Sequence, residues 1–189
     1  AGRLGPLTQS SKLLVALVVA AVAIAFADSS IVVLALPELY GRFDTTIEGV
    51  SWVVTAYNVA VAAGALVLVL FVHRVDAAKT LAAGLIVFLG ASIACAAAQS
   101  LPFLIGARSV QGVGAALLLA ASLPALAALT GSAATGASIW TLAGTFGAAL
   151  GPALGGVLTQ AFDWRAIFVA QAPVAALGLL ATTRAHPHA

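Results

Sequence analysis

The sequence is poor in charged residues, cysteine and methionine. Only 7% of its 189 residues are charged, whereas soluble domains carry about 25%. The single cysteine, Cys95, cannot form a disulfide within the chain, which excludes a disulfide-stapled fold. Methionine is absent even at position 1, so we expect a processed, tagged or truncated chain. The net charge of +2 comes from scattered basic residues, and we expect no nucleic-acid partner.

Apolar residues dominate what is present. They make up 62% of the chain, and the mean hydropathy is +1.14. Six stretches can each cross a hydrocarbon layer of about 30 Å as a helix, which takes about 20 residues. We expect these spans at residues 13–36, 50–72, 78–98, 101–129, 137–158 and 164–182. The sequence thus predicts an all-α membrane protein, with a six-helix transmembrane bundle at 13–183 between a short N-terminal segment, 1–12, and a tail, 184–189.

The distribution of basic residues predicts the orientation. One side of the expected bundle holds Arg3, Lys12, Arg74, Lys79 and Arg184. Because cytoplasmic loops carry the excess of Lys and Arg, both termini should be cytoplasmic in a multi-pass protein of the plasma (inner) membrane. An alternative is that Ala25–Ala27 forms a signal-peptidase site. Against it, the apolar run continues to Leu36 and is long enough to span.

Two charges of opposite sign lie inside expected spans. Asp28 and Arg108 each carry a cost of at least about 2.5–3.5 kcal/mol in hydrocarbon, so they should be paired or face a watery cavity. Asp28 lies eight residues before Leu36, and Arg108 lies six residues after Pro102. At 1.5 Å per residue both lie about 9–12 Å below the outer boundary. Such charges usually mark ion or substrate pathways, and these two can pair if their helices are neighbours.

A glycine-rich run, GTFGAALGPALGG, is the strongest local pattern. Three of its glycines recur every four residues and form one face that lets another helix backbone approach closely. The run comprises Gly144, Gly147, Gly151, Pro152, Gly155 and Gly156. The proline removes a helix hydrogen bond and can bend the outer half of the helix. Ordinary helix packing is the alternative for a single glycine pair, but two overlapping pairs are rarer.

This run resembles the antiporter motif of helix 5 in the major facilitator superfamily. Leu104–Leu118 resembles the helix 4 motif, with Arg108, Gln111, Gly112 and Gly114 in their expected places. Ala27–Leu39 resembles the helix 1 motif of the fourteen-helix drug:proton antiporter branch, with Asp28 as the acidic residue, Pro37 as the closing proline and Val33 replacing a usual asparagine. Trp52–Gly64 and Asp163–Pro173 are similar to helices 2 and 6 of that branch.

The resemblance implies one six-helix half of such a transporter, built from two three-helix inverted repeats. Asp28 would be the proton and cation site, where a proton, a cationic substrate and Arg108 compete. Burial favours the neutral carboxyl group, whereas a guanidinium favours the carboxylate. Expected to line the proton and substrate site are Asp28, Arg108, Gln111, Trp52, Tyr57 and Asn58. For Trp52, interface anchoring is the alternative, and Gln171 is a further cavity candidate. The implied function is proton-coupled export of hydrophobic or cationic small molecules (multidrug efflux).

Two features depart from the family pattern. The loop between helices 2 and 3 normally forms a cytoplasmic latch, which here is degenerate. Arg74 and Lys79 remain, while His73 and Asp76 replace an acid and a glycine. The second departure is length, since six helices make only half a transporter. A second copy, as a twofold dimer of twelve helices, a complementary half or the remainder of a cut protein would complete it.

Two rival interpretations remain open. A non-transporting membrane anchor or regulatory module derived from a transporter half is one, and it fits the altered latch. A buried clamp between Asp28 and Arg108 that only fixes helix packing is the other. An enzyme is not expected, because the sequence offers no nucleophile–base pair, acidic dyad or metal cluster. We likewise expect no cofactor and no metal.

Overall fold

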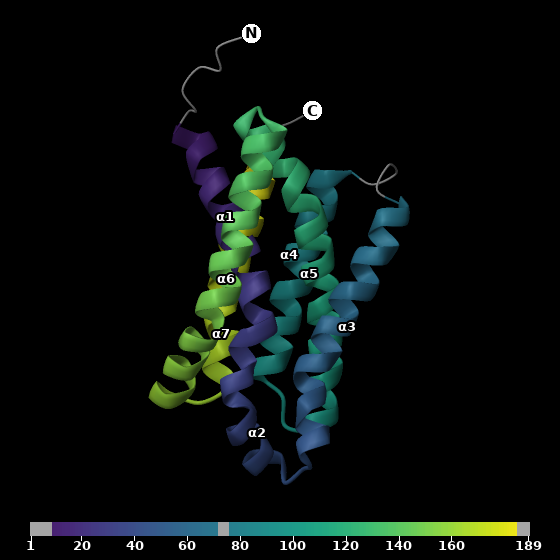
Figure 1. Cartoon of the computed structure of the whole chain (residues 1–189), viewed down its shortest axis with the longest axis vertical. Helices are drawn as coiled ribbons and strands as arrows, with labels where there is room; N and C mark the ends of the chain where they lie inside the picture. Colours follow the sequence, from purple (N-terminus) through teal and green to yellow (C-terminus); the bar gives the residue numbers. More distant parts are fainter. Residues whose placement is uncertain (1–8, 72–75, 185–189) are drawn as a thin grey trace.

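The computed structural model describes residues 9–71 and 76–184, and every regular element in these ranges is helical (Figure 1). The expectation of an all-helical chain is confirmed. The elements are α1 (Gln9–Ile31), the 3-10 turn η1 (Val32–Ala35), α2 (Leu36–Phe43), α3 (Ile47–Phe71), α4 (Ala77–Ala96), α5 (Leu101–Thr130), α6 (Ala133–Ala161) and α7 (Arg165–Arg184). Most of the expected terminal segments, and residues 72–75, lie outside the described ranges.

Five of the described helical segments are long and apolar enough to cross a membrane. They are Gln9–Phe43, Ile47–Leu70, Ala77–Ala96, Leu101–Thr130 and Ala133–Ala161. The described apolar stretch of α7, Arg165–Leu180, is shorter. The first segment runs on past Leu36, where we expected a span to end, because η1 and α2 continue the helical path. Pro37 lies in the first turn of α2, where its missing N–H leaves no helix bond unmade.

Local sequence explains where several helices begin and end. The carboxylate of Asp76 caps α4 by accepting a hydrogen bond from the Lys79 backbone N–H at 2.9 Å. The hydroxyl of Ser132 caps α6 by accepting one from the Thr135 N–H at 3.2 Å. Both caps satisfy a backbone donor that the first helical turn leaves without a partner. Gly131 ends α5 in the left-handed region, with φ of 66°, which glycine adopts without strain.

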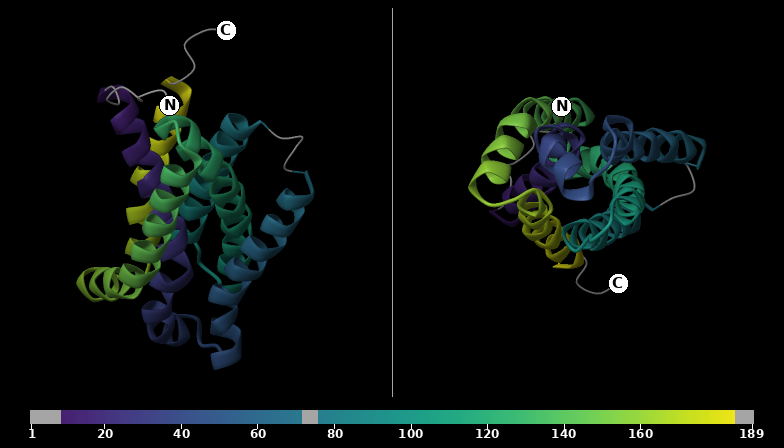
Figure 2. Two further views of the ribbon diagram at one scale, coloured as in Figure 1. Left: turned by 45° about the horizontal axis from the view of Figure 1, so that its top comes forward. Right: turned by 90° about the horizontal axis from the view of Figure 1, so that it is seen from below.

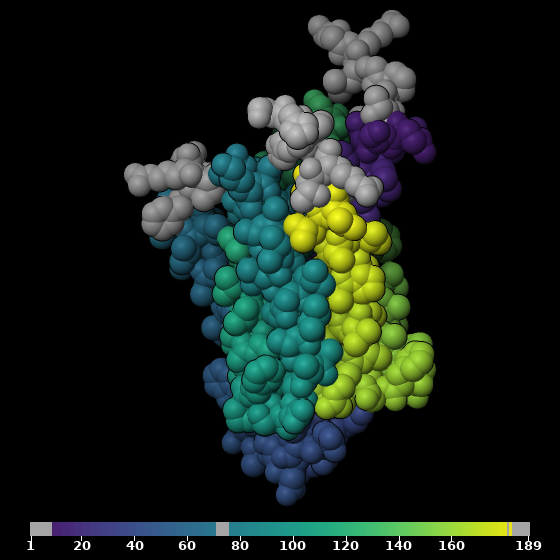
Figure 3. All heavy atoms as spheres, turned by 180° about the vertical axis from the view of Figure 1, so that it is seen from behind, coloured from purple at the N-terminus to yellow at the C-terminus, as the bar shows by residue number. Residues whose placement is uncertain are grey.

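Successive long helices run in opposite directions along the bundle (Figures 1 and 2). The start of α1 and the end of α7 therefore lie at the same end of the molecule. The most extensive pairings are α4 with α5, α1 with α6 and α3 with α5. At the back, α4 and α7 lie side by side (Figure 3). This arrangement places α1 against both α5 and α7, and the two buried charges lie on α1 and α5.

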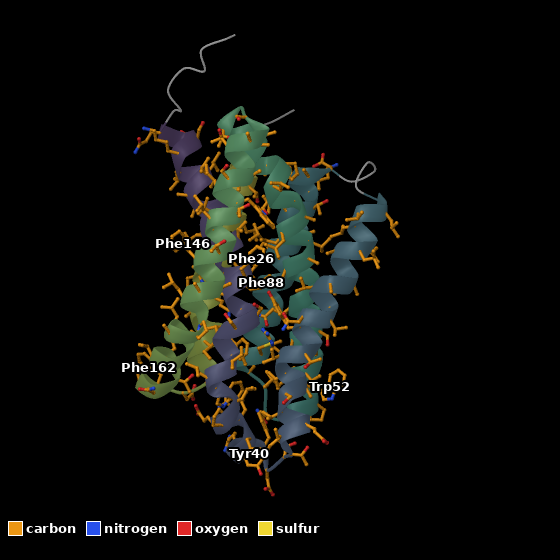
Figure 4. The ribbon with its side chains drawn as sticks, viewed as in Figure 1. Phe26, Tyr40, Trp52, Phe88, Phe146 and Phe162 are labelled. Atoms are coloured by element: carbon orange, nitrogen blue, oxygen red, sulfur yellow. The ribbon has the colours of Figure 1, made fainter. Side chains whose placement is uncertain are left out.

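Two buried clusters fill the interior on either side of the charges. One lies around Val22, Leu85 and Phe88, and the other around Leu104 and Trp164. The Phe88 side chain is fully buried within the bundle, whereas Trp52, Phe146 and Phe162 point outward (Figure 4). An apolar exterior is expected for a surface that meets lipid or another apolar chain.

Candidate proton and substrate site

Asp28 of α1 and Arg108 of α5 form an ion pair inside the bundle. Arg108 Nη1 lies 2.5 Å from Asp28 Oδ2, and both side chains are 0% exposed. They were expected to be paired or to face a watery cavity. The pairing is present, but the residues around it fully enclose both groups. At a buried site, attraction offsets the loss of hydration only when further hydrogen bonds satisfy the remaining polar atoms.

Arg108 obtains those further hydrogen bonds from three helices. Its Nε donates to the carbonyl oxygen of Val53 on α3 at 3.0 Å, and its Nη2 donates to the carbonyl oxygen of Asp28 at 3.3 Å. Its Nη1 also donates to Oε1 of Gln111 at 2.7 Å. The guanidinium lies 4.2 Å from the ring centre of Tyr57, within range of a cation–π interaction. Arg108 is therefore a junction between α1, α3 and α5.

Two glutamines close a ring of hydrogen bonds around the ion pair. Gln111 Nε2 donates to Gln171 Oε1 at 2.8 Å, and Gln171 Nε2 donates to Asp28 Oδ1 at 2.6 Å. Gln111 Nε2 also lies 2.9 Å from the hydroxyl oxygen of Ser92, which in turn donates to a backbone carbonyl of α4. We call Asp28, Arg108, Gln111 and Gln171 the amide ring. It ties α1, α5 and α7 together, and Ser92 adds α4.

The expected site residues separate into two groups. Tyr57 is buried, its hydroxyl donates to the carbonyl oxygen of Ala25 at 2.7 Å, and its aromatic ring packs against Arg108 of the amide ring. Trp52 is 54% exposed, and the exposed Asn58 donates its amide to Val54 of its own helix at 3.2 Å. Neither reaches the ring, because positions 52, 57 and 58 point in different directions around a helix of 3.6 residues per turn. Trp52 and Asn58 lie on the outer surface of α3.

Sequence reasoning named Gln171 only as a possible cavity residue and missed Ser92 and Val53. The position of Gln111 beside Arg108 can be inferred from sequence, because it lies three residues after Arg108 and so on the same face of α5. A polar residue in an apolar helix was the one available signal for Gln171 and Ser92. Their pairing depends on how α4, α5 and α7 pack, which no local pattern specifies.

The glycine face of α6 packs directly on the backbone of α1. A Cβ added at Gly147 would lie 2.8 Å from the carbonyl carbon of Ala23, and one at Gly151 would lie 2.8 Å from the carbonyl oxygen of Ala27. Gly155 meets Ile31 in the same way. Gly144 and Gly156 instead face side chains of α1 and η1. The four-residue spacing of the glycines therefore matches successive turns of the facing helix.

Pro152 lies within α6, which continues through it from Ala133 to Ala161. Because proline has no N–H, the carbonyl of Ala148, four residues earlier, loses its helical donor. The hydroxyl of Ser30 on α1 lies 3.1 Å from that carbonyl oxygen and 3.1 Å from the Ala27 carbonyl oxygen of its own helix. The α1–α6 contact thus offers the Ala148 carbonyl a donor that it shares with Ala27.

An apolar cavity of about 500 Å³ lies between the amide ring and the end of the bundle where α1 begins. It is lined by residues of α1, α3, α4, α5 and α6, among them Phe26, Val61, Leu119 and Trp140. The rings of Phe26 and Trp140 meet edge to face at 5.2 Å, and Trp140 Nε1 donates to the Ser122 hydroxyl at 2.9 Å. Its size lies within the usual range for small-molecule pockets, about 300–1,000 Å³.

The expected cytoplasmic latch is described only in part. His73 and Arg74 lie outside the described residues. Asp76 acts as the N-cap of α4 through the backbone N–H of Lys79. This is a structural role for Asp76, and the latch itself stays a prediction. Among the described residues, no group of three or more His, Cys, Asp or Glu side chains could hold a metal ion.

Comparison with known proteins identifies relatives in transport. The sequence profile described as "Major Facilitator Superfamily" matches residues 18–189. Multidrug resistance protein Stp of Mycobacterium tuberculosis is 34% identical over 160 residues, which cover 83% of this chain and 30% of that protein. Drug efflux pump JefA of the same organism is 34% identical over 163 residues, with 83% and 32% covered. The chain spans about a third of the length of these curated relatives.

Two further matches agree with these. Methylenomycin A resistance protein of Bacillus subtilis is 33% identical over 160 residues, covering 83% of this chain and 34% of that protein. Among solved structures, a bacterial homologue of the human lysosomal transporter Spinster, in an inward-facing and unoccupied conformation, superposes with a TM-score of 0.72. That match covers 95% of this chain and 43% of the other, at 13% identity, and so concerns the fold alone.

Proposed function

Because the chain belongs to the major facilitator superfamily and is a multi-pass membrane protein, we propose that it is a six-helix half of a proton-coupled exporter of hydrophobic, often cationic small molecules. The observation that carries the proposal is the fully buried pair of Asp28 and Arg108. Ionisable groups inside membrane spans are rare and typically belong to ion or substrate pathways. The relatives named for multidrug resistance and drug efflux supply the proposed class of substrate.

In this proposal the proton and the substrate occupy different places. Asp28 takes up the proton, and the neutral acid then holds Arg108 less strongly. The apolar cavity beside Phe26 and Trp140 accommodates the hydrophobic body of the substrate. Because the ring residues enclose Asp28 completely in this conformation, a cationic substrate reaches its carboxylate only after the helices around it separate. The expected competition at Asp28 therefore belongs to a more open conformation.

We further propose that the bundle consists of two inverted three-helix repeats. The first repeat is α1, α3 and α4, and the second is α5, α6 and α7. In these repeats α1 corresponds to α5, and α3 corresponds to α6. The contact of α1 with α6 is therefore equivalent to the contact of α5 with α3, and both are among the most extensive helix pairings in the bundle. Asp28 and Arg108 then lie on equivalent helices. Equivalent first helices of inverted repeats meet at the substrate site in many transporters.

The proposed half needs a partner surface. Large apolar side chains stand exposed along α6, where Phe146, Leu150 and Leu154 are each more than half exposed. A second copy of the chain or a complementary six-helix half would cover such a surface. With both termini of the chain on the proposed cytoplasmic side, two copies share one topology and can pair about an axis along the membrane normal.

The test is proton-coupled transport in proteoliposomes with Asp28→Asn. We expect drug flux driven by a pH gradient to be lost while binding of the hydrophobic drug persists. Asp44→Asn is the matched control, since Asp44 is exposed and its backbone φ of 44° suits asparagine equally well. Unchanged proton-driven export by Asp28→Asn would overturn the assignment of Asp28.

The buried ion pair also supports a second candidate role, a clamp that only fixes helix packing. The observation in its favour is that the four residues of the amide ring are hydrogen-bonded to one another within the bundle. The two roles predict different relations between folding stability and transport activity in variants of Asp28 and Arg108. A clamp requires that folding stability and transport fall in parallel across charge-removing variants. A proton site requires a folded variant that no longer couples transport to protons.

A further inference from the structure

When Asp28 is ionised, only one orientation of the Gln111 and Gln171 side-chain amides satisfies every hydrogen bond in the amide ring. Arg108 has no acceptor and an ionised carboxylate has no donor, so the two ends of the chain of amides are fixed. Gln111 must turn its oxygen toward Arg108, and Gln171 must turn its nitrogen toward Asp28. The nitrogen of Gln111 then meets the oxygen of Gln171, as observed at 2.8 Å. Each link therefore contains one donor and one acceptor.

A proton on Asp28 Oδ1 destroys this match. The new O–H would face the N–H of Gln171, which lies 2.6 Å from that oxygen. If the Gln171 amide turns over, its oxygen accepts from the acid, but its nitrogen then faces the nitrogen of Gln111. Turning Gln111 as well would aim a donor at Arg108, which has only donors. A proton on Oδ1, the oxygen that does not face Arg108, therefore breaks one link of the ring whichever amide moves.

Ser92 offers the displaced amide a new partner. Its hydroxyl oxygen lies 3.5 Å from the Gln171 oxygen, the position that the Gln171 nitrogen takes after the amide turns. The Ser92 proton is already donated to the Phe88 carbonyl at 2.8 Å, so both of its lone pairs can accept. With Gln111 and Gln171 both donating to Ser92, each amide nitrogen keeps one acceptor, while the direct bond between the two glutamines is lost. The site thus has two bonded states that differ by one proton and by the partner of Gln171.

We propose that Gln171 is a positioning residue that reports the protonation of Asp28 by exchanging its partner from Gln111 on α5 to Ser92 on α4. The inference rests on the proposed proton uptake at Asp28 and deepens it. In the ionised state Gln171 links α7 to α1 and α5. In the protonated state it links α7 to α1 and α4, and α5 is released from α7. A proton at one atom thereby changes which helices are held together.

Other titratable groups near Asp28 are few. Arg108 faces it from α5, and the Tyr57 hydroxyl of α3 bonds the neighbouring Ala25 carbonyl. The Cys95 sulfur of α4 lies 3.6 Å from the Gln111 oxygen, and Arg165 near the start of α7 is bonded to a backbone carbonyl of the α4–α5 turn. From α6, glycines meet this part of α1. Among these described groups, Asp28 is the one carboxylate in the ring.

The test is an infrared titration of the whole chain in lipid bilayers. The chain has only six Asp and Glu residues in total, so the carboxylic-acid band of Asp28 can be assigned by its loss in Asp28→Asn. Gln171→Leu removes a charge-assisted bond to the carboxylate and a weaker, neutral bond to the acid. Because the carboxylate loses more, the band should appear at a pH higher by on the order of one unit. Ser92→Ala removes the acceptor needed in the protonated state, and the band should appear at a pH lower by a similar amount.

Opposite shifts are the signature of the exchange, because a merely structural role for either residue gives no reason for opposite signs. Gln160→Leu, at an exposed glutamine of α6, is the matched control and should leave the band unchanged. Ser92→Thr keeps a hydroxyl and should restore the wild-type midpoint. Shifts in the same direction, or no shift in Ser92→Ala, would overturn the inference. Opposite shifts in a protein that transports nothing would leave the exchange standing and remove the proposed function.

Discussion

Substitution of Gly147 by alanine tests whether the glycine face sets the distance between α1 and α6. The added Cβ would lie 2.8 Å from the carbonyl carbon of Ala23 and 2.9 Å from its Cα. Ordinary contact requires a further separation of about 0.5 Å or more, and the interior is too closely packed to supply it locally. Since backbone atoms form the obstacle, the helices must move apart.

The expected energy combines two opposing effects. Overpacking costs about 1–3 kcal/mol, while replacing glycine by alanine within a helix gains about 0.5–1 kcal/mol. Gly147→Ala should therefore lower the free energy of unfolding by about 1–2 kcal/mol. Gly106→Ala is the matched control, because a Cβ at Gly106 of α5 meets nothing within 4 Å. It should raise the free energy of unfolding by about 0.5–1 kcal/mol.

The assay is reversible unfolding of the purified chain in mixed micelles, followed by circular dichroism. The informative quantity is the difference between the two variants in free energy of unfolding, which should be about 2 kcal/mol. Relative to the wild type, Gly147→Ala should be less stable and Gly106→Ala more stable. Equal effects of Gly147→Ala and Gly106→Ala would refute the reasoning, because both variants carry the same propensity gain and differ only in what the new Cβ meets.

Two further predictions concern Arg108 and Asp76. Arg108→Leu should lower the free energy of unfolding by about 3–5 kcal/mol, because it leaves Asp28 charged and buried without its partner. Asp28→Asn combined with Arg108→Leu should recover part of that loss in the same unfolding assay, and additive losses would contradict the pairing. Asp76→Ala should cost about 1 kcal/mol through the lost cap of α4, whereas Asp76→Asn should cost little. Equal losses in both Asp76 variants would point to its charge and favour the latch.

Sequence reasoning succeeded where a single helix determines the answer. The similar depths of Asp28 and Arg108 followed from a fixed rise per residue and two span boundaries. The close-approach face of α6 followed from three glycines at four-residue spacing, because that spacing returns to the same side of a helix. Both arguments need only the geometry of one helix at a time.

The partners of Asp28 other than Arg108 could not be identified from one helix at a time, because they depend on how several helices pack together. The long helices are apolar nearly all round, so no amphipathic stripe identifies the side that faces the bundle. Gln171 is separated from Asp28 by 143 positions in sequence, and only the packing of α7 against α1 brings them together. For the same reason the sequence could not separate Tyr57, which faces inward, from Trp52, which faces outward.

The glycine face and the amide ring are consequences of one placement of α1. The glycines of α6 contact the α1 backbone at Ala23, Ala27 and Ile31, which fall on one side of that helix. Asp28 follows Ala27 by one residue and therefore points about 100° away, toward α5 and α7. Because α1 meets α6 through backbone atoms, it has little freedom to rotate about its axis. The glycine spacing thus fixes the direction of the carboxylate, and a change of partners in the ring must involve α5 or α7 before it involves the α1–α6 contact.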